Sequence, residues 1–169
     1  MQMSKDTGRW VQRTLLGLNQ EDSGMIHFVL GNLDSPALYT LARWQLGVDM
    51  VYRTVKCGLV DVNDYGAFPD RKSFYQGIRT LNPDDSSGDG FWHATLVWGT
   101  ERLSQLVDTY FQPRGERNNE LNPGFLEAIE EVFAENGVPW SDEPLLPIMP
   151  NAGRDAEGAR LDHDVALAE

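Results

Sequence analysis

The sequence has a single cysteine, Cys57, and no apolar segment long enough to cross a bilayer. One thiol excludes an internal disulfide and any metal site built from several thiolates, and it agrees with a reducing compartment. A membrane-spanning helix needs about 20 consecutive apolar residues, and the first ten residues lack the charged and then apolar layout of a signal peptide. We therefore expect a cytoplasmic protein.

Basic residues are also scarce. There are 14 Lys and Arg against 26 Asp and Glu, which gives a formal net charge of −12. This charge repels nucleic-acid phosphates and anionic lipid, whereas it steers basic proteins toward the surface. The sequence thus predicts a basic protein partner and neither a nucleic acid nor a membrane.

The acidic residues are unevenly distributed along the chain. Residues 141–169 contain seven acidic and two basic residues, several prolines and glycines, and only short aliphatic side chains after Met149. Such a composition cannot bury enough surface to become ordered. We predict a helical domain over residues 1–140 and a flexible acidic tail over residues 141–169, from about Asp142, that either aids solubility or docks a partner.

No catalytic signature is present. The histidines, His27, His93 and His163, lack the spacing of a zinc site. Cys57 falls at the end of a predicted helix, where the helix dipole disfavours a thiolate, so we interpret it as a packed small residue. The segment DDSSGDG at 84–90 offers oxygen ligands without the spacing of a calcium loop, and a helix-capping loop is the simpler interpretation. We expect no metal, no cofactor and no enzymatic activity.

Helical patterns dominate what is present. Asp34-Ser35-Pro36 offers an N-cap followed by proline at the first helical position, and apolar residues then recur at three- and four-residue steps as far as Val55. Gly58 provides a left-handed stop. The pattern predicts one long central helix over about 36–57.

Three further segments show start and stop signals. The predicted helices begin after Asp70, Thr100 and Asn122, and end before Pro83, Pro113 and Gly137. Shorter amphipathic helices are expected over 10–18 and 25–30. Residues 91–98, FWHATLVW, fit either strand alternation or a helix, and we favour the helix; residues 59–62 fit a short strand whose best partner is 91–98. The predicted fold is a single, mainly α domain that could include a two-stranded element.

Two surface features suggest a binding role. Asp84, Asp85 and Asp89 precede the large aromatic side chain of Trp92, which combines acidic steering groups with the type of residue enriched at interface hot spots. On the helix after Pro123, a second set lies at four-residue steps opposite the apolar face and comprises Glu127, Glu131 and Glu135. The alternative interpretations are that Trp92 belongs to the core and that the glutamates form an ordinary solvated face.

Three runs have a recognisable layout: LARWQLGVDMVYRTVKCGLVDV, then FPDRKSFYQGIRTLNPDD, then GFWHATLVWGTERLSQLVDTYF. Over about residues 36–111 this layout resembles small helical bacterial immunity proteins, which neutralise cognate secreted toxins. The resemblance implies an antitoxin that binds and occludes the catalytic domain of a basic toxin, but it transfers no binding residue.

Two other functions fit the same sequence. An acidic secretion chaperone or adaptor would present an exposed apolar groove to a partner's unfolded segment. An enzyme or small-ligand protein would need a pocket, for which the surroundings of Trp44, Cys57 and His93 are the candidate place.

Overall fold

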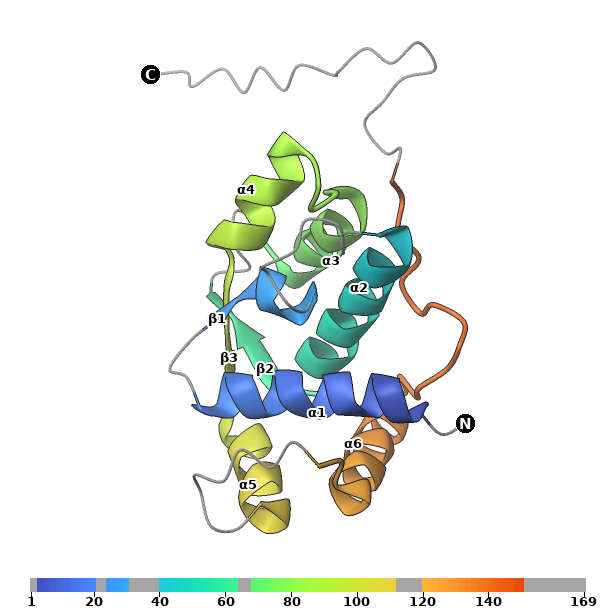
Figure 1. Cartoon of the computed structure of the whole chain (residues 1–169). Helices are drawn as coiled ribbons and strands as arrows, with labels where there is room; N and C mark the ends of the chain where they lie inside the picture. The colour runs from blue at the N-terminus through green and yellow to red at the C-terminus, as the bar shows by residue number, and fades with distance from the viewer. Residues whose placement is uncertain (1–2, 21–23, 31–39, 64–67, 112–119, 151–169) are drawn as a thin grey trace.

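The computed structural model describes residues 3–20, 24–30, 40–63, 68–111 and 120–150. Its elements follow the order α1 (Lys5–Gln20), β1 (Gly24–Met25), η1 (Ile26–Leu30, a 3-10 helix), α2 (Leu41–Lys56), β2 (Val60–Val62), α3 (Arg71–Thr80), α4 (Ser86–Ala94), β3 (Leu96–Gly99), α5 (Glu101–Tyr110) and α6 (Pro123–Glu135). Figure 1 shows α1 lying across the molecule, with α2, α3 and α4 on one side of it and α5 and α6 on the other. The mainly helical fold is confirmed. None of the described helices is both long and apolar enough to span a bilayer.

Side-chain caps fix the starts of three helices where the sequence predicts them. The side chains of Asp70, Thr100 and Asn122 each accept a hydrogen bond from the backbone N–H three residues on, at 2.7, 3.4 and 3.1 Å. Each cap satisfies a donor that the first helical turn leaves without a partner. The predictions for α3, α5 and α6 are therefore confirmed.

The long helix over 36–57 is not confirmed. Helix α2 begins at Leu41, because Thr40 has an extended backbone (φ −100°, ψ 156°) and its hydroxyl accepts from the N–H of Arg43 at 3.1 Å. The predicted cap at Asp34 and Ser35 lies outside the described residues. The predicted end is correct: Cys57 is the C-cap, and Gly58 has the left-handed φ of 66° that favours glycine.

Residues 91–98 contain parts of two elements, so the preference for a single helix is wrong. Helix α4 ends at Ala94, and β3 begins at Leu96. Strand β3 is the centre of a three-stranded antiparallel sheet in the order β1-β3-β2, with Asp61 opposite Trp98 and Gly24 opposite Val97. The predicted pairing of 59–62 with this segment is confirmed, whereas residues 24–25 add a third strand and 26–30 form only a 3-10 helix.

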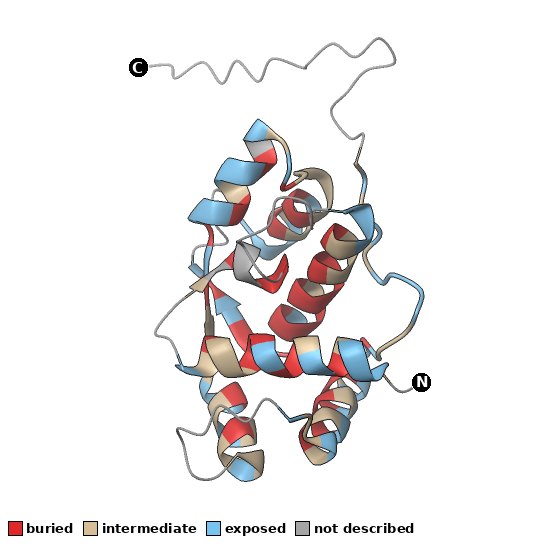
Figure 2. Cartoon of the chain, in the orientation of Figure 1, coloured by how far each residue is buried: buried red, intermediate tan, exposed pale blue. Residues whose placement is uncertain are grey.

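The core surrounds α2. Figure 2 shows α2 as the most extensively buried helix of the view. Val48, Met50 and Val55 are each at most 2% exposed, and α1 and α6 contribute Leu15 and Phe133, which are fully buried. This helix therefore organises the domain although it is shorter than predicted.

Residues 141–150, which we call the strap, correct the expectation of a flexible tail from Asp142. The strap lies along α2 and α3: the side-chain oxygen of Gln45 accepts from the N–H of Ile148 at 2.9 Å, and its amide donates to the carbonyl of Leu146 at 3.1 Å. On α3, the side chain of Arg79 donates from Nε to the carbonyl of Pro147 at 2.8 Å, and the backbone carbonyl of Arg79 accepts from the N–H of Met149 at 2.7 Å. Two helix side chains and one backbone carbonyl of α3 thus supply the partners that a proline-rich segment cannot find in a ladder of its own. Residues 151–169 lie outside the described part of the chain.

Candidate functional site

The acidic set at the start of α4 is largely committed to the fold. Asp85 is the N-cap of α4, and its side chain accepts from the N–H of Gly88 at 3.3 Å. Asp84 is exposed, and Asp89 lies 3.0 Å from Nδ1 of His93 one turn later. The capping interpretation of this loop is therefore correct, and two of its three carboxylates remain at the surface.

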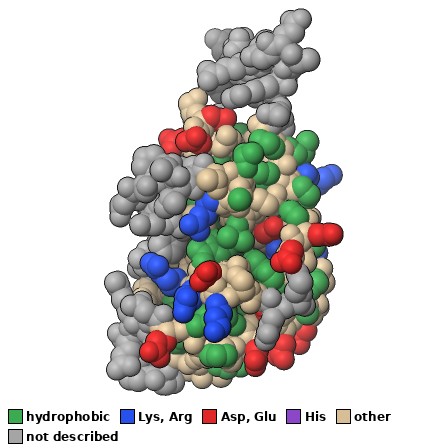
Figure 3. Space-filling view, turned by 45° about the vertical axis from the view of Figure 1, so that its right-hand side comes forward, with side chains coloured by type: hydrophobic (Ala, Val, Ile, Leu, Met, Phe, Trp, Pro, Cys, Tyr) green, Lys and Arg blue, Asp and Glu red, His purple; other side chains and the backbone are tan. Residues whose placement is uncertain are grey.

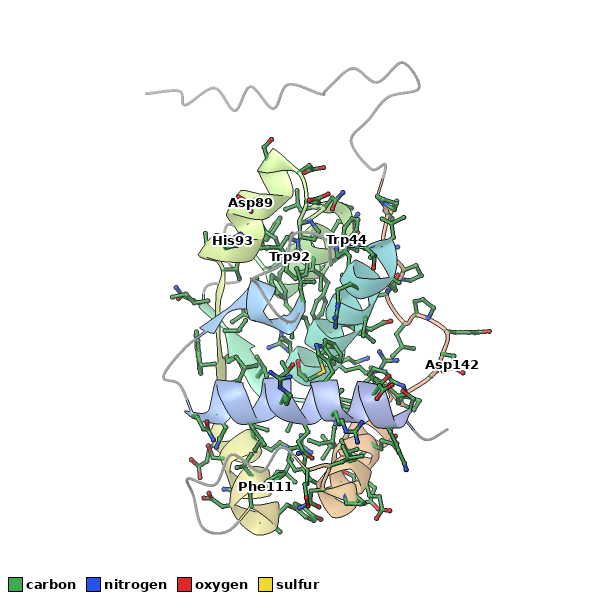
Figure 4. The ribbon with its side chains drawn as sticks, in the orientation of Figure 1. Trp44, Asp89, Trp92, His93, Phe111 and Asp142 are labelled. Carbon is green, nitrogen blue, oxygen red and sulfur yellow. The ribbon has the colours of Figure 1, made fainter. Side chains whose placement is uncertain are left out.

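Trp92 does not lie on that surface. Its side chain is fully buried, and its indole nitrogen donates to the carbonyl of Leu81 at 2.7 Å. Figure 4 shows Trp92 on the inner side of α4, with Asp89 and His93 on the outer side. Phe91 packs edge-on against it, with 5.8 Å between the ring centroids. Trp92 is a core residue, so it cannot be an interface anchor while the protein is folded.

The three residues proposed to surround a ligand pocket, Trp44, Cys57 and His93, do not form one site. Trp44 is buried and donates its indole N–H to the carbonyl of Ile78 at 2.9 Å, whereas His93 is exposed. Cys57 is 2% exposed with its sulfur 3.7 Å from the carbonyl of Val132, and burial raises the pKa of its thiol. Within the described ranges, no group of three or more His, Cys, Asp or Glu side chains could hold a metal ion.

The acidic face of α6 has the geometry that its spacing predicts. Glu127, Glu131 and Glu135 are exposed, whereas Phe125 and Phe133 on the opposite face are fully buried. In the described part of the chain, none of these three glutamates has a hydrogen-bond or ion-pair partner. Figure 3 shows acidic side chains gathered at the lower right of its view, toward the end of the molecule where α6 lies. The α6 face therefore offers carboxylates that the fold itself does not use.

A hollow of about 320 Å³ adjoins this face, and its lining combines acid with an aromatic ring. Glu127, Glu130 and Glu131 form one side, and the rest consists of Ala134, Pro139 and Trp140. Glu130 accepts a hydrogen bond from the N–H of Met3, so one of the three carboxylates has a partner within the protein. We call these six lining residues the acidic hollow. A cationic side chain fits such a lining, because carboxylates attract it and an aromatic ring face stabilises it.

An ion pair beneath the hollow positions its aromatic wall. Arg53 lies with its guanidinium carbon 4.8 Å from the ring centroid of Trp140, and it donates to the carbonyl of Pro139 from Nη2 at 3.2 Å. Its Nη1 is 3.3 Å from Oδ1 of Asp49, and the two side chains are 1% and 10% exposed. Oδ1 of Asp49 also accepts from the N–H of Leu145 in the strap at 3.1 Å. One buried pair therefore connects the strap to the acidic hollow.

Burial shifts the pKa values of this pair. It raises the pKa of Asp49, against the opposing influence of Arg53 and of the strap amides, and it lowers the pKa of Arg53. Sequence reasoning identified the glutamates of α6 but missed Trp140, Arg53 and Asp49. The only sequence signal for the pair was an acid and a base four residues apart on one helix, on a face that is otherwise apolar.

Comparison with protein-family models, with curated proteins and with solved structures gave no match for this chain.

Proposed function

We propose that this chain is an immunity protein that binds and occludes the catalytic domain of a basic bacterial toxin, with the α6 face and the acidic hollow as its contact surface. The observation that supports the proposal is the juxtaposition of unpartnered carboxylates at Glu127 and Glu131 with the aromatic side chain of Trp140. Inhibition by occlusion requires no chemistry from the inhibitor. A net charge of −12 would accelerate the encounter with a basic substrate cleft. Such a cleft is expected in a toxin whose substrate carries phosphates.

At the contact, a lysine or arginine of the toxin would enter the acidic hollow. The carboxylates would supply charge-assisted hydrogen bonds, and the ring of Trp140 would cover the apolar stem of the incoming side chain. The guanidinium of Arg53 already holds this ring, which lowers the entropic cost of forming the contact. Asp84 and Asp89, which are exposed on α4, then contribute to long-range steering and not to the contact.

The first test is affinity capture with the intact protein at low and high salt, followed by mass spectrometry. The proposal expects one basic protein with a hydrolase or transferase domain, in near-equal amount, whose activity the chain inhibits. Recovery of no such protein from a host that expresses its toxins would contradict it.

The second test places the contact. Reversing Glu127, Glu131 and Glu135 to lysine should slow association with the captured protein and flatten the salt dependence of the rate. The matched control reverses Asp61, Asp84 and Asp89, which are also exposed, so the net charge is the same. If both triple variants slow association equally, only the overall field matters, and the α6 face is not the contact.

One observation favours a second candidate, a secretion chaperone or adaptor. Leu41, Leu145 and Met149 are 57%, 39% and 42% exposed, and they belong to the strap or to the helix that it lies along. Such side chains suit an unfolded apolar segment. Capture that is abolished by Leu145→Ser and Met149→Ser, yet insensitive to the α6 reversals, would favour the chaperone.

A further inference from the structure

The strap is much less buried than the two helices that it lies along. All of its residues are exposed or half-buried, and its packing against the core comes from Leu146 and Ile148. The rest of the attachment is polar, because Asp49 and Gln45 on α2 and Arg79 on α3 bind the backbone of the strap. A segment with few buried apolar contacts opens at a lower free energy than the helices beneath it. The strap can therefore detach while the domain stays folded.

A fixed point precedes the strap. Helix α6 ends in a left-handed turn at Gly137 (φ 71°), and the N–H of Val138 then donates to the carbonyl of Phe133 at 2.9 Å. Val138 is 1% exposed, so its side chain anchors the chain in the core. The next two residues, Pro139 and Trp140, line the acidic hollow and lead directly into the strap. A strap that detaches therefore pivots beyond Val138 and takes Trp140 with it.

Two residues of α2 connect the position of Trp140 to the docked strap. Arg53 donates to the carbonyl of Pro139 at 3.2 Å, and its guanidinium carbon lies 4.8 Å from the ring centroid of Trp140. Oδ1 of Asp49 accepts from the N–H of Leu145 at 3.1 Å and lies 3.3 Å from Nη1 of Arg53. The strap and the guanidinium that holds the ring thus share one carboxylate oxygen. Detachment of the strap removes a donor from that oxygen and admits water to the pair, which weakens the hold of Arg53 on the ring.

We infer that the strap opens and closes as a unit, and that its closure holds Trp140 in place, through Asp49 and Arg53, as the aromatic wall of the acidic hollow. The open protein retains its helices and the glutamates of α6 but loses the wall beside them. Binding in the hollow then favours the docked strap, and release of the strap favours dissociation. What the hollow binds rests on the proposed function, whereas the opening of the strap does not.

Native-state hydrogen exchange of the full-length protein, without any partner, tests whether the strap opens by itself. NMR follows the four strap amides that donate to α2 and α3, which are those of Leu145, Leu146, Ile148 and Met149. After correction for intrinsic rates, we expect these amides to report one common opening equilibrium. Their exchange should be roughly tenfold or more faster than that of the Ile129 and Phe133 amides in α6.

Arg79→Met tests the connection to Trp140 from the far end of the strap. It removes the side-chain hydrogen bond to Pro147 and leaves the buried ion pair of α2 intact. Loss of this bond should speed the exchange of the Leu145 amide by about 3- to 10-fold, and it should shift the indole N–H resonance of Trp140. The matched control, Arg13→Met, makes the same substitution at an exposed position on α1 and should change neither quantity.

A second variant, Asp49→Asn, acts at the shared carboxylate oxygen. It should speed exchange by about tenfold or more, also at Met149, whose N–H binds Arg79 and not Asp49. The indole resonance of Trp140 should move in the same direction as in Arg79→Met. Asp61→Asn makes the same charge change at an exposed position on β2 and is the matched control.

Three results would overturn the inference. Strap amides that exchange as slowly as that of Phe133 would mean that the strap opens only when the domain unfolds. Faster exchange confined to the amides nearest each substitution would mean that the strap does not open as a unit. An unchanged indole resonance in both variants would mean that the ring of Trp140 is held independently of the strap. Failure of the proposed function is distinguishable, because it would leave the exchange and the indole shifts as expected while no toxin is captured.

Discussion

The start of α4 and the exposed face of α6 look alike in sequence and differ in use. Both place several carboxylates close to large aromatic side chains. At α4 the fold uses Asp85 as a cap and buries Trp92 against the carbonyl of Leu81. At α6, Glu127 and Glu131 have no partner among the described residues, and Trp140 is only half-buried beside them. The difference is whether backbone groups need the carboxylates as partners. The N–H groups of the first helical turn need acceptors, whereas in the middle of a helix the backbone groups already bond to one another.

The largest expected effect separates the two tryptophans. Trp92→Ala should lower the free energy of unfolding by about 3–5 kcal/mol, because it removes a fully buried ring and leaves a cavity. Trp140→Ala should cost about 1–2 kcal/mol, since it removes a half-buried ring and one cation–π contact. Urea unfolding measures both. Equal losses in the two variants would show that Trp140 is also a core residue and would remove it from the candidate contact surface.

Two glycines of α4 sharpen the contrast within one helix. A Cβ on Gly88 would lie 1.7 Å from the backbone oxygen of Asn82, whereas a Cβ on Gly90 meets nothing within 4 Å. Gly88→Ala should therefore destabilise by about 1–3 kcal/mol or more, because backbone has to move. Gly90→Ala should stabilise by about 0.5–1 kcal/mol, as alanine restricts the unfolded chain. The midpoints of thermal unfolding should shift in opposite directions; a shift in the same direction would mean that α4 is packed differently.

The carboxylates provide a smaller difference. Asp85→Ala removes a cap and should lower the free energy of unfolding by about 1 kcal/mol, and Asp85→Asn, which preserves the acceptor, should restore most of it. Glu131→Ala should change stability by only a few tenths of a kcal/mol and in the stabilising direction, because it relieves like-charge repulsion with neighbours four residues away. Denaturant midpoints at low salt give the comparison. A loss near 1 kcal/mol for Glu131→Ala would reveal a structural role for the α6 face.

The smallest effect is a pair of opposite pH slopes. Burial raises the pKa of Asp49, so the native state binds its proton more tightly than the unfolded state, and stability falls as pH rises from about 3.8 through the raised pKa. Hydrogen bonds from the Ser73 backbone and side chain lower the pKa of Asp70, so its contribution is present above about 3.8 and is lost as pH falls through the lowered pKa.

Asparagine variants at these two positions isolate each slope. Asp49→Asn should flatten the dependence of unfolding free energy on pH above 3.8, and Asp70→Asn, which still caps α3, should flatten it below 3.8. Urea titrations from pH 2.5 to 7 measure both. A steeper slope above 3.8 in Asp49→Asn would contradict the raised pKa.

Local chemistry explains why much of the fold could be predicted. Asp70, Thr100 and Asn122 act within three residues of their own positions, so the sequence contains both donor and acceptor of each cap. Thr40 caps α2 in the same way, but the prediction placed the cap at Asp34-Ser35-Pro36, so the predicted helix begins earlier than α2 does. The glutamates of α6 were identifiable for a similar reason, because helical spacing alone determines which of them share a face.

The strap and the acidic hollow depend on partners that are distant in sequence. Asp49 and Gln45 bind backbone groups that are 96 to 103 residues away. The prolines of the strap led to the prediction of a flexible tail, because a proline-rich segment cannot form a regular ladder of backbone hydrogen bonds. The sequence does not show which distant groups provide hydrogen-bond partners instead. Trp140 could have been suspected as a large aromatic next to the end of α6, although its contact with Arg53 requires the fold.

The position of Cys57 gives this protein an internal reporter of opening. Cys57 is only 2% exposed and its sulfur lies 3.7 Å from the carbonyl of Val132 in α6, so a thiol reagent can reach it only when the packing around this contact opens. The rate of thiol modification under native conditions therefore measures how often this contact opens, with no engineered label. A partner that binds the α6 face of the closed molecule should slow thiol modification to an extent that increases with the fraction of protein bound. The modification rate of Cys57 would then report partner binding.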